Sequence, residues 1–230
     1  MLTKNINFKN FKLKKNNKKI RKDLRNLLDE SNEILKSLSS RYKNSYDKKF
    51  ISKFKTFTHV RIIGMGGSIL GAHSIYDFLK IKIKKSFYFI NNLKSKISFS
   101  DRKTKYLNLV VSKSGNTLET ISNSNVLIKN KDNNIFITEN KKSYLYSLAE
   151  KLKAEIVHHN NFIGGRYSVL SEVGMLPAEL MGLDISKFKQ LNNLIKNKNF
   201  ISALVINVNN TLHFLKQKKF NSIILNYDEA

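Results

Sequence analysis

Short apolar runs alternate with segments of helical periodicity through the middle of the chain. Five runs predict β-strands, at residues 59–63, 87–90, 106–111, 134–138 and 155–158. The segments after the first, third and fourth runs repeat their apolar residues every three or four positions, which predicts helices. Strands that alternate with helices at this rhythm indicate a parallel sheet covered on both faces. The expected fold is α/β, a doubly wound three-layer sandwich with a five-stranded parallel sheet.

Helical patterns flank this central region on both sides. Apolar positions from Ile20 to Leu38 share one face and predict a single packing helix that ends near Ser39 and Ser40. A polar stretch, 42–58, predicts a connecting helix or loop. Beyond the last strand, helical patterns cover three segments, 169–181, 188–195 and 200–215.

These patterns divide the chain into three parts. We expect an N-terminal helical segment (1–57), a sheet domain (58–185) and a C-terminal helical segment (186–230). The run Phe220–Tyr227 has the composition of a strand. It either adds to a sheet edge or opens a second α/β domain.

Composition narrows the class of protein. The chain has 230 residues, of which 41% are hydrophobic, enough for one main core. With no cysteine, it has neither disulfides nor a zinc-thiolate site, which suits a reducing compartment. No run approaches the length of a membrane helix, and the first residues are polar where a signal peptide is apolar. We expect a cytoplasmic protein without a membrane partner.

The formal net charge of +25 raises the question of a nucleic-acid partner. Only six of the 42 basic residues are Arg, although phosphate and base readout favours the Arg fork. The densest cluster, Lys9–Lys22, carries apolar residues between its charges and reads as a solvated arm or first helix. We expect no specific nucleic-acid partner and only a general attraction for anionic substrates.

A glycine turn, Gly64–Ser68, follows the first predicted strand and precedes a helix. It begins like a dinucleotide-binding G-x-G-x-x-G, but Ile69 stands at the third glycine position. The acidic residue expected after the second strand is also missing, and no P-loop motif occurs in the chain. The turn lets a small ligand approach backbone N–H groups; Ser68 is either a further donor or a helix N-cap.

A second turn, Ser112–Thr120, follows the most apolar strand. Its hydroxyls at Ser112, Ser114 and Thr117 surround Gly115, and a helix is expected to begin near Asn116. Hydroxyl donors and helix N-terminal amides together suit the oxygens of a phosphate monoester. With Asn116 as N-cap, Glu119 would stand in a capping box. Lys113 is either a solvated lysine or an electrostatic partner of the ligand.

A third turn presents Arg166 between two glycines and Ser168. Because glycines have no side chain, a substrate can approach the Arg166 guanidinium closely. This arrangement favours a functional role for Arg166. The neighbouring His158 and His159 point to opposite sides if they lie on a strand, and His73 lies within a helix. We expect all three histidines to be structural or surface residues.

Three motifs in this order carry a family resemblance. They are GMGGSILG (64–71), SKSGNTLET (112–120) and IGGRYSVLSEVGMLPAELMGLD (163–184). The chain resembles the glucose-6-phosphate isomerase (phosphoglucose isomerase) family within the sugar isomerase (SIS) superfamily, and specifically its N-terminal SIS half. The resemblance implies interconversion of glucose 6-phosphate and fructose 6-phosphate, the reaction of glycolysis and gluconeogenesis. It implies no metal, no cofactor and a homodimer in the full-length form.

The resemblance also implies roles for individual residues. Ser112, Ser114 and Thr117 would hold the substrate phosphate, with Lys113 nearby. Gly66, Gly67 and Ser68 would lie beside the sugar. Arg166 would be catalytic, because it matches the arginine that stabilises the enediolate.

The chain departs from the family pattern in two ways, and each leaves an alternative function open. Gly115-Asn116 replaces the usual middle of the phosphate turn, a pattern nearer to other SIS proteins and to dual phosphoglucose/phosphomannose isomerases, so a dual isomerase is one alternative. We expect the second SIS domain, which carries the family's glutamate base, to be missing, and none of Glu119, Glu172 or Glu179 sits in the base motif. We expect a truncated isomerase that binds sugar phosphate and whose base lies beyond Ala230. The alternative from another class is a non-catalytic SIS regulator that binds a phosphosugar.

Overall fold

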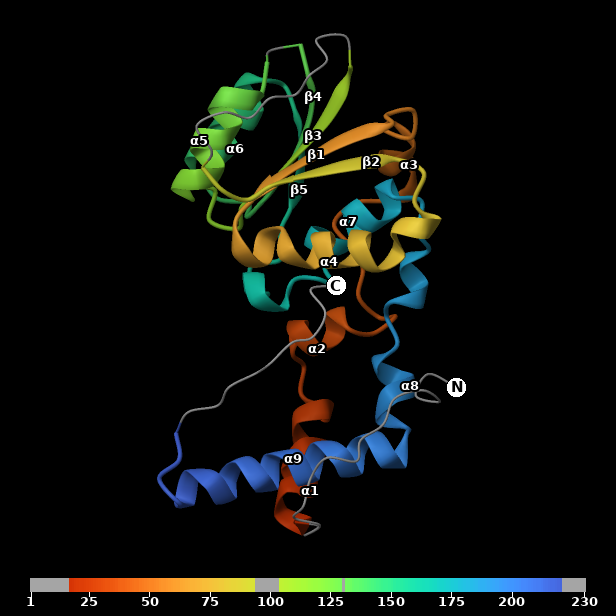
Figure 1. Ribbon diagram of the computed structural model, residues 1–230, viewed down its shortest axis with the longest axis vertical. Coiled ribbons are helices and arrows are strands. Elements are labelled where there is room, and N and C mark those ends of the chain that lie inside the picture. The colour runs from red at the N-terminus through yellow and green to blue at the C-terminus, as the bar shows by residue number, and fades with distance from the viewer. Residues whose placement is uncertain (1–16, 94–103, 130, 221–230) are drawn as a thin grey trace.

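A parallel sheet forms the centre of the molecule, as the computed structural model of residues 17–93, 104–129 and 131–220 shows (Figure 1). Its five strands follow the order β2-β1-β3-β4-β5. They are β1 (His59–Gly64), β2 (Ser86–Ile90), β3 (Tyr106–Val111), β4 (Asn133–Thr138) and β5 (Glu155–His158). All four neighbouring pairs are parallel. The predicted α/β fold and its five strands are confirmed.

Helices cover both faces of the sheet. They are α3 (Lys48–Ser52), α4 (Leu70–Leu79), α5 (Leu118–Leu127), α6 (Tyr144–Lys151) and α7 (Glu172–Leu180). Successive strand residues point to opposite faces: Leu109 packs into the core under α3, α4 and α7, and Val110 into the core under α5 and α6. Because both faces are buried, apolar residues predominate on both sides of the strands, with Arg61, Asn108 and Asn134 as buried exceptions, and this made the strands visible in the sequence.

The strand order reverses direction between β1 and β3. From β1 the chain moves outward to β2, then returns past β1 to β3 and continues to the opposite edge. Gly64 and Val111, the last residues of β1 and β3, are paired in register. The turns that follow these two strands therefore begin side by side, at the point where ligands bind in open α/β sheets.

The remaining helices lie away from the sheet. They are α1 (Lys18–Asp29), α2 (Glu33–Ser37), α8 (Leu191–Ile195) and α9 (Lys198–Lys216). In Figure 1 α1 crosses α9 at the end of the molecule far from the strands, and the Asn17 amide donates to Asn209 at 3.2 Å. The two flanking segments of the sequence thus pack against each other. No helix in the described part of the chain is both long and apolar enough to cross a membrane.

The prediction of one helix over residues 20–39 is wrong. The chain leaves the helical conformation at Glu30, and α2 begins after Asn32. The Asn32 side chain accepts hydrogen bonds from the N–H groups of Ile34 and Leu35, at 2.9 and 3.3 Å. A side chain that caps a new helix favours a break in the preceding helix. The spacing of apolar residues does not reveal such a break.

Two predictions fall largely outside the described residues. They concern the basic cluster Lys9–Lys22 and the strand-like run Phe220–Tyr227. The proposed boundaries at residues 57/58 and 185/186 stay predictions.

Candidate functional site

The turn after β3 brings two hydroxyl groups together. The Oγ of Ser112 lies 3.0 Å from the Oγ1 of Thr117, a hydrogen-bonding distance. Thr117 is the N-cap residue of α5, yet its side chain makes no capping hydrogen bond. The Thr117 side chain therefore accepts no hydrogen bond from the first N–H groups of α5. The positive end of the helix dipole lies beside the two hydroxyls. This combination suits a phosphate group.

The same turn is fixed against the start of α6. Gly115 has φ +67°, and its carbonyl oxygen accepts from the Leu145 N–H at 3.0 Å. Asn116 accepts from the Tyr144 N–H at 3.0 Å, so it serves α6 and is not the N-cap of α5 as predicted. Since Thr117 is the N-cap, Glu119 stands at the second helical position, and the predicted capping box is also wrong.

The other two predicted residues of this turn differ in their surroundings. Ser114 is exposed, and its hydroxyl accepts from the Asn116 N–H at 3.3 Å. The Lys113 ammonium donates to the Asn161 carbonyl oxygen at 2.7 Å and lies 3.4 Å from the Glu139 carboxylate. Lys113 thus ties the turn to the loop after β5, a contact that local sequence does not signal. Its role as a phosphate partner stays a prediction.

The first and third turns touch each other directly. Gly67 belongs to the 3-10 helix η1 (Gly66–Ser68), and Gly165 begins the 3-10 helix η3 (Gly165–Tyr167). A Cβ added to Gly67 would lie 2.3 Å from the Gly165 carbonyl oxygen. Only a glycine permits this approach of two backbones. Ser68 is not an N-cap, because α4 begins after Ile69 and has no side-chain cap.

Arg166 stands at this junction with its guanidinium exposed. Within the described residues no carboxylate pairs with it. It lines a groove of about 610 Å³ along α4, together with Gly67, Gly71 and Phe188. The turn at residues 64–68 therefore contacts both of the others. It lies beside the Ser112 turn because β1 and β3 end in register, and it touches the Arg166 turn through Gly67. No described hydrogen bond or ion pair joins Arg166 to the hydroxyls of Ser112 and Thr117.

The histidines show no sign of a metal site. Nowhere in the described ranges do three His, Asp or Glu side chains gather as metal ligands would. His73 stacks on Phe89, with ring centroids 4.3 Å apart, and pairs with Asp77 on the same helix. His159 is buried, and burial lowers the pKa of its imidazole, which therefore stays neutral at neutral pH.

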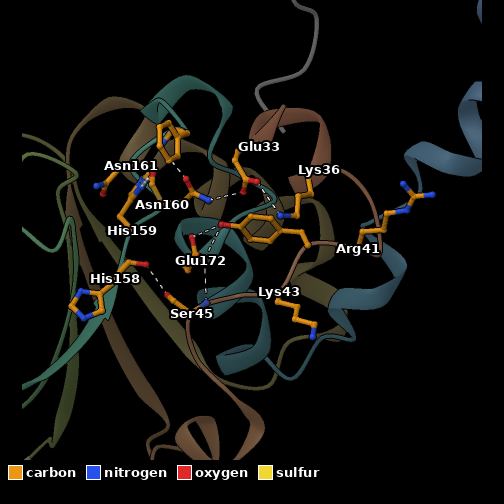
Figure 2. A pocket seen from close by; sticks show the side chains of 12 residues that line it. Glu33, Lys36, Arg41, Lys43, Ser45, His158, His159, Asn160, Asn161 and Glu172 are labelled. Atoms are coloured by element: carbon orange, nitrogen blue, oxygen red, sulfur yellow. Dashed lines mark hydrogen bonds and ion pairs between the residues drawn. The ribbon is translucent and has the colours of Figure 1, made fainter. Parts of the chain in front are cut away.

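Two of the three acids weighed from the sequence are engaged elsewhere. The buried Glu172 carboxylate accepts from the Tyr42 hydroxyl at 2.8 Å and from the Ser45 N–H at 3.2 Å (Figure 2). Burial, and then the charge of Glu172, raise the pKa of Tyr42 and keep this donor protonated. Burial and the charge of Glu179 likewise raise the pKa of Tyr46. No described hydrogen bond or ion pair joins Glu172 or Glu179 to the turn at residues 112–120.

The pattern of a known family extends over nearly the whole chain. A family model described as phosphoglucose isomerase matches residues 9–219, which include all three turns. The chain belongs to the phosphoglucose isomerase family. The resemblance carried by the three motifs is confirmed.

Curated relatives of the phosphoglucose isomerase family agree with this assignment. The glucose-6-phosphate isomerase of Methanocaldococcus jannaschii is 33% identical over 205 residues, 80% of this chain and 50% of that protein. The glucose-6-phosphate isomerase of Mycoplasmopsis pulmonis is 35% identical over 184 residues, 69% of this chain and 42% of that protein. The chain spans about half the length of the curated relatives it matches.

A solved structure supports the fold of this phosphoglucose isomerase family chain. A crystal structure of a hypothetical protein from Thermus thermophilus superposes with a TM-score of 0.64 at 20% identity. The match covers 87% of this chain and 52% of that one.

Proposed function

We propose that this chain binds hexose phosphates and acts in the interconversion of glucose 6-phosphate and fructose 6-phosphate. One observation carries the proposal: the Ser112 and Thr117 hydroxyls converge at the N-terminus of α5, beside the switch point of the sheet. Family membership supports the same class of ligand.

The proposed reaction needs a fixed positive charge beside the sugar carbons. A base removes the proton from C2 of the open-chain aldose, the electron pair forms a C1–C2 double bond, and the carbonyl oxygen becomes anionic. A proton moves from the C2 hydroxyl to the C1 oxygen, the abstracted proton returns to C1, and the C2 carbonyl forms, which gives the ketose. We assign Arg166 to stabilise the enediolate oxygen, because its guanidinium is exposed and has no carboxylate partner in the described structure. Gly67 lets the turn that carries Arg166 pack directly against the first turn.

We assign the proton transfer to a base other than Glu172 or Glu179. Both carboxylates are engaged with tyrosines, and Glu119 stands in the first turn of α5, where it complements the helix dipole. The proposal is therefore that the 230 residues bind the phosphosugar and leave it unconverted when no other polypeptide is present.

Binding is tested by isothermal titration of fructose 6-phosphate into the wild-type chain and a Ser112→Ala/Thr117→Ala variant. Each hydrogen bond to a charged group contributes about 1.5–3 kcal/mol, so the double variant should bind at least about tenfold more weakly at this site. Ser52→Ala is the matched control, because Ser52 is exposed on α3 and bonds only to its own helix. Equal affinity of the double variant and the control would contradict the phosphate assignment.

Turnover is tested separately, by coupling formation of glucose 6-phosphate to its dehydrogenase. We expect no turnover by the purified chain. Turnover that Arg166→Ala abolishes would contradict the assignment of the base while supporting the isomerase reaction. Mannose 6-phosphate in a parallel binding titration measures the breadth of substrate.

A further inference from the structure

A separate cavity opens beside β5. Its volume is about 620 Å³, and its walls come from α2, residues 41–45, residues 158–162 and Glu172 of α7 (Figure 2). None of Ser112, Thr117 or Arg166 lines it. We call it the β5 cavity. A cavity of this size accepts a ligand as large as a sugar phosphate.

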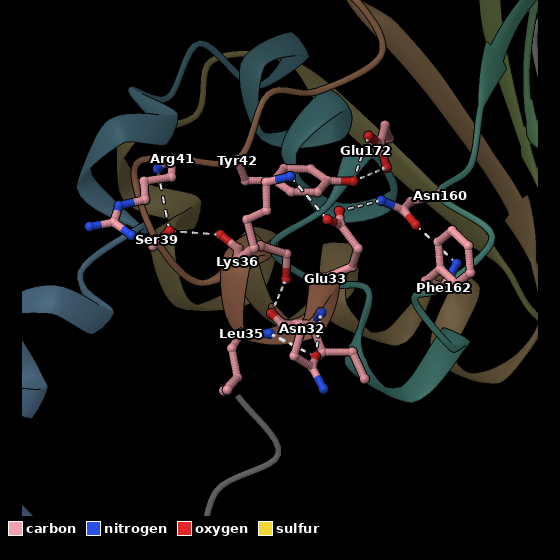
Figure 3. Close-up of polar contacts among 12 residues, drawn as sticks. Asn32, Glu33, Leu35, Lys36, Ser39, Arg41, Tyr42, Asn160, Phe162 and Glu172 are labelled. Atoms are coloured by element: carbon pink, nitrogen blue, oxygen red, sulfur yellow. Dashed lines mark hydrogen bonds and ion pairs between the residues drawn. The ribbon is translucent and has the colours of Figure 1, made fainter. Parts of the chain in front are cut away.

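One wall of the β5 cavity is held in place by hydrogen bonds. The Asn160 side chain donates to the Glu33 carboxylate at 2.9 Å and accepts from the Phe162 N–H at 2.9 Å (Figure 3). The next residue, Asn161, accepts from Lys113 at 2.7 Å through its carbonyl oxygen. The Asn160 side chain and the Asn161 carbonyl are therefore fixed before a ligand arrives, which lowers the entropy cost of binding.

The charges around the β5 cavity leave a positive excess. Glu33 is paired with Lys36 at 2.9 Å. Glu172 accepts from Tyr42, whose ring lies 4.4 Å beneath the buried Lys189 ammonium, so this carboxylate also has a nearby cation.

Arg41 and Lys43 line the same cavity, and neither has a carboxylate partner among the described residues. Figure 2 shows both side chains extending from the segment that forms one wall. Two unpaired cations on one wall suit a phosphate dianion.

An exposed aromatic ring completes the lining. The Phe162 side chain is 80% exposed and stands next to Asn160 in Figure 3. A flat apolar ring beside amides and carboxylates can pack against the C–H groups of a sugar while the polar groups bind its hydroxyls. We propose that the β5 cavity is a second ligand site, which takes a phosphorylated sugar or polyol attracted by the cations Arg41 and Lys43 in its lining.

The test is a calorimetric titration of fructose 6-phosphate into the full chain at 0.15 M salt. The proposal predicts two binding events per chain. Arg41→Gln/Lys43→Gln should weaken one of them at least about tenfold, and Ser112→Ala/Thr117→Ala should weaken the other. Lys80→Gln/Lys82→Gln, a matched loss of two exposed lysines elsewhere, should leave both events unchanged. Thermal melting monitored by circular dichroism confirms that each variant is folded.

A second arm separates sugar recognition from general anion binding. Phe162→Ala should weaken fructose 6-phosphate at the β5 cavity and leave the affinity for inorganic phosphate unchanged. A single event, abolished by Ser112→Ala/Thr117→Ala, would overturn the second site and leave the proposed function standing. Equal losses in the Arg41/Lys43 and Lys80/Lys82 variants would also overturn it, because the chain's overall charge would then explain the binding. No saturable event at all would contradict both proposals.

Discussion

Gly115 is the position where the phosphate turn is least tolerant of a side chain. Its φ of +67° is a conformation that disfavours any residue with a Cβ. A Cβ built there would lie 2.0 Å from the Oγ of Ser143 and 2.7 Å from its Cβ. Ser143 is the N-cap of α6 and accepts from the Tyr146 N–H. Gly115→Ala should therefore strain the turn and displace the cap of the neighbouring helix.

The magnitude follows from these two contacts. Holding alanine in the left-handed region costs roughly 1–2 kcal/mol. Loss of a serine N-cap costs about 1 kcal/mol more. Gly115→Ala should lower the free energy of unfolding by about 2–3 kcal/mol and, because the hydroxyls move with the turn, weaken fructose 6-phosphate binding about tenfold.

The assay is urea denaturation of paired variants. Gly182→Ala is the matched control: its φ is +85°, but nothing lies within 4 Å of an added Cβ, so only the backbone cost of about 1–2 kcal/mol applies. Ser143→Ala measures the cap alone. If Gly115→Ala is no more destabilising than Gly182→Ala and binds the ligand normally, the contact with α6 has no part in shaping the turn.

Three further predictions concern other contacts. Gly67→Ala should abolish fructose 6-phosphate binding in calorimetry because the added Cβ collides with Gly165. Gly164→Ala is the control and should bind normally, because its added Cβ has no neighbour closer than 3.8 Å. Normal binding by Gly67→Ala and loss of binding by Gly164→Ala would contradict the contact between the two turns. Tyr42→Phe should lower the free energy of unfolding in urea by about 1–3 kcal/mol because it removes a donor to buried Glu172, and the exposed Tyr167→Phe should change it little. Burial lowers the pKa of His159, so the unfolded chain binds its proton more tightly and stability should fall as pH drops below about 6.5. His159→Gln should flatten that part of the stability curve, and an unchanged slope would exclude this cause.

Much of the sheet could be predicted because its strands are buried on both faces. Runs such as 106–111 are apolar except at Asn108, and the glycine and hydroxyl turns that follow them mark the carboxyl edge. The order of strands then places the turns after β1 and β3 together, since both begin at paired strand ends.

The errors arose where a side chain has a choice of partners. Asn32 begins a new helix within a continuous apolar pattern, and Asn116 accepts from the first N–H group of α6 although its sequence position suits an N-cap of α5. Likewise Lys113 binds a carbonyl 48 residues away, and Gly67 meets Gly165 across the fold. Such contacts depend on the tertiary arrangement, and no local period or motif encodes them.

We propose above that the amides and hydroxyls of residues 112–120 bind the phosphate of a sugar. The most direct measurement is a ¹H–¹⁵N NMR titration of the chain with fructose 6-phosphate. The account predicts saturable shifts of the amides at the start of α5, and loss of these shifts in Ser112→Ala/Thr117→Ala. Saturable binding that leaves the amides of residues 112–120 unchanged would contradict it.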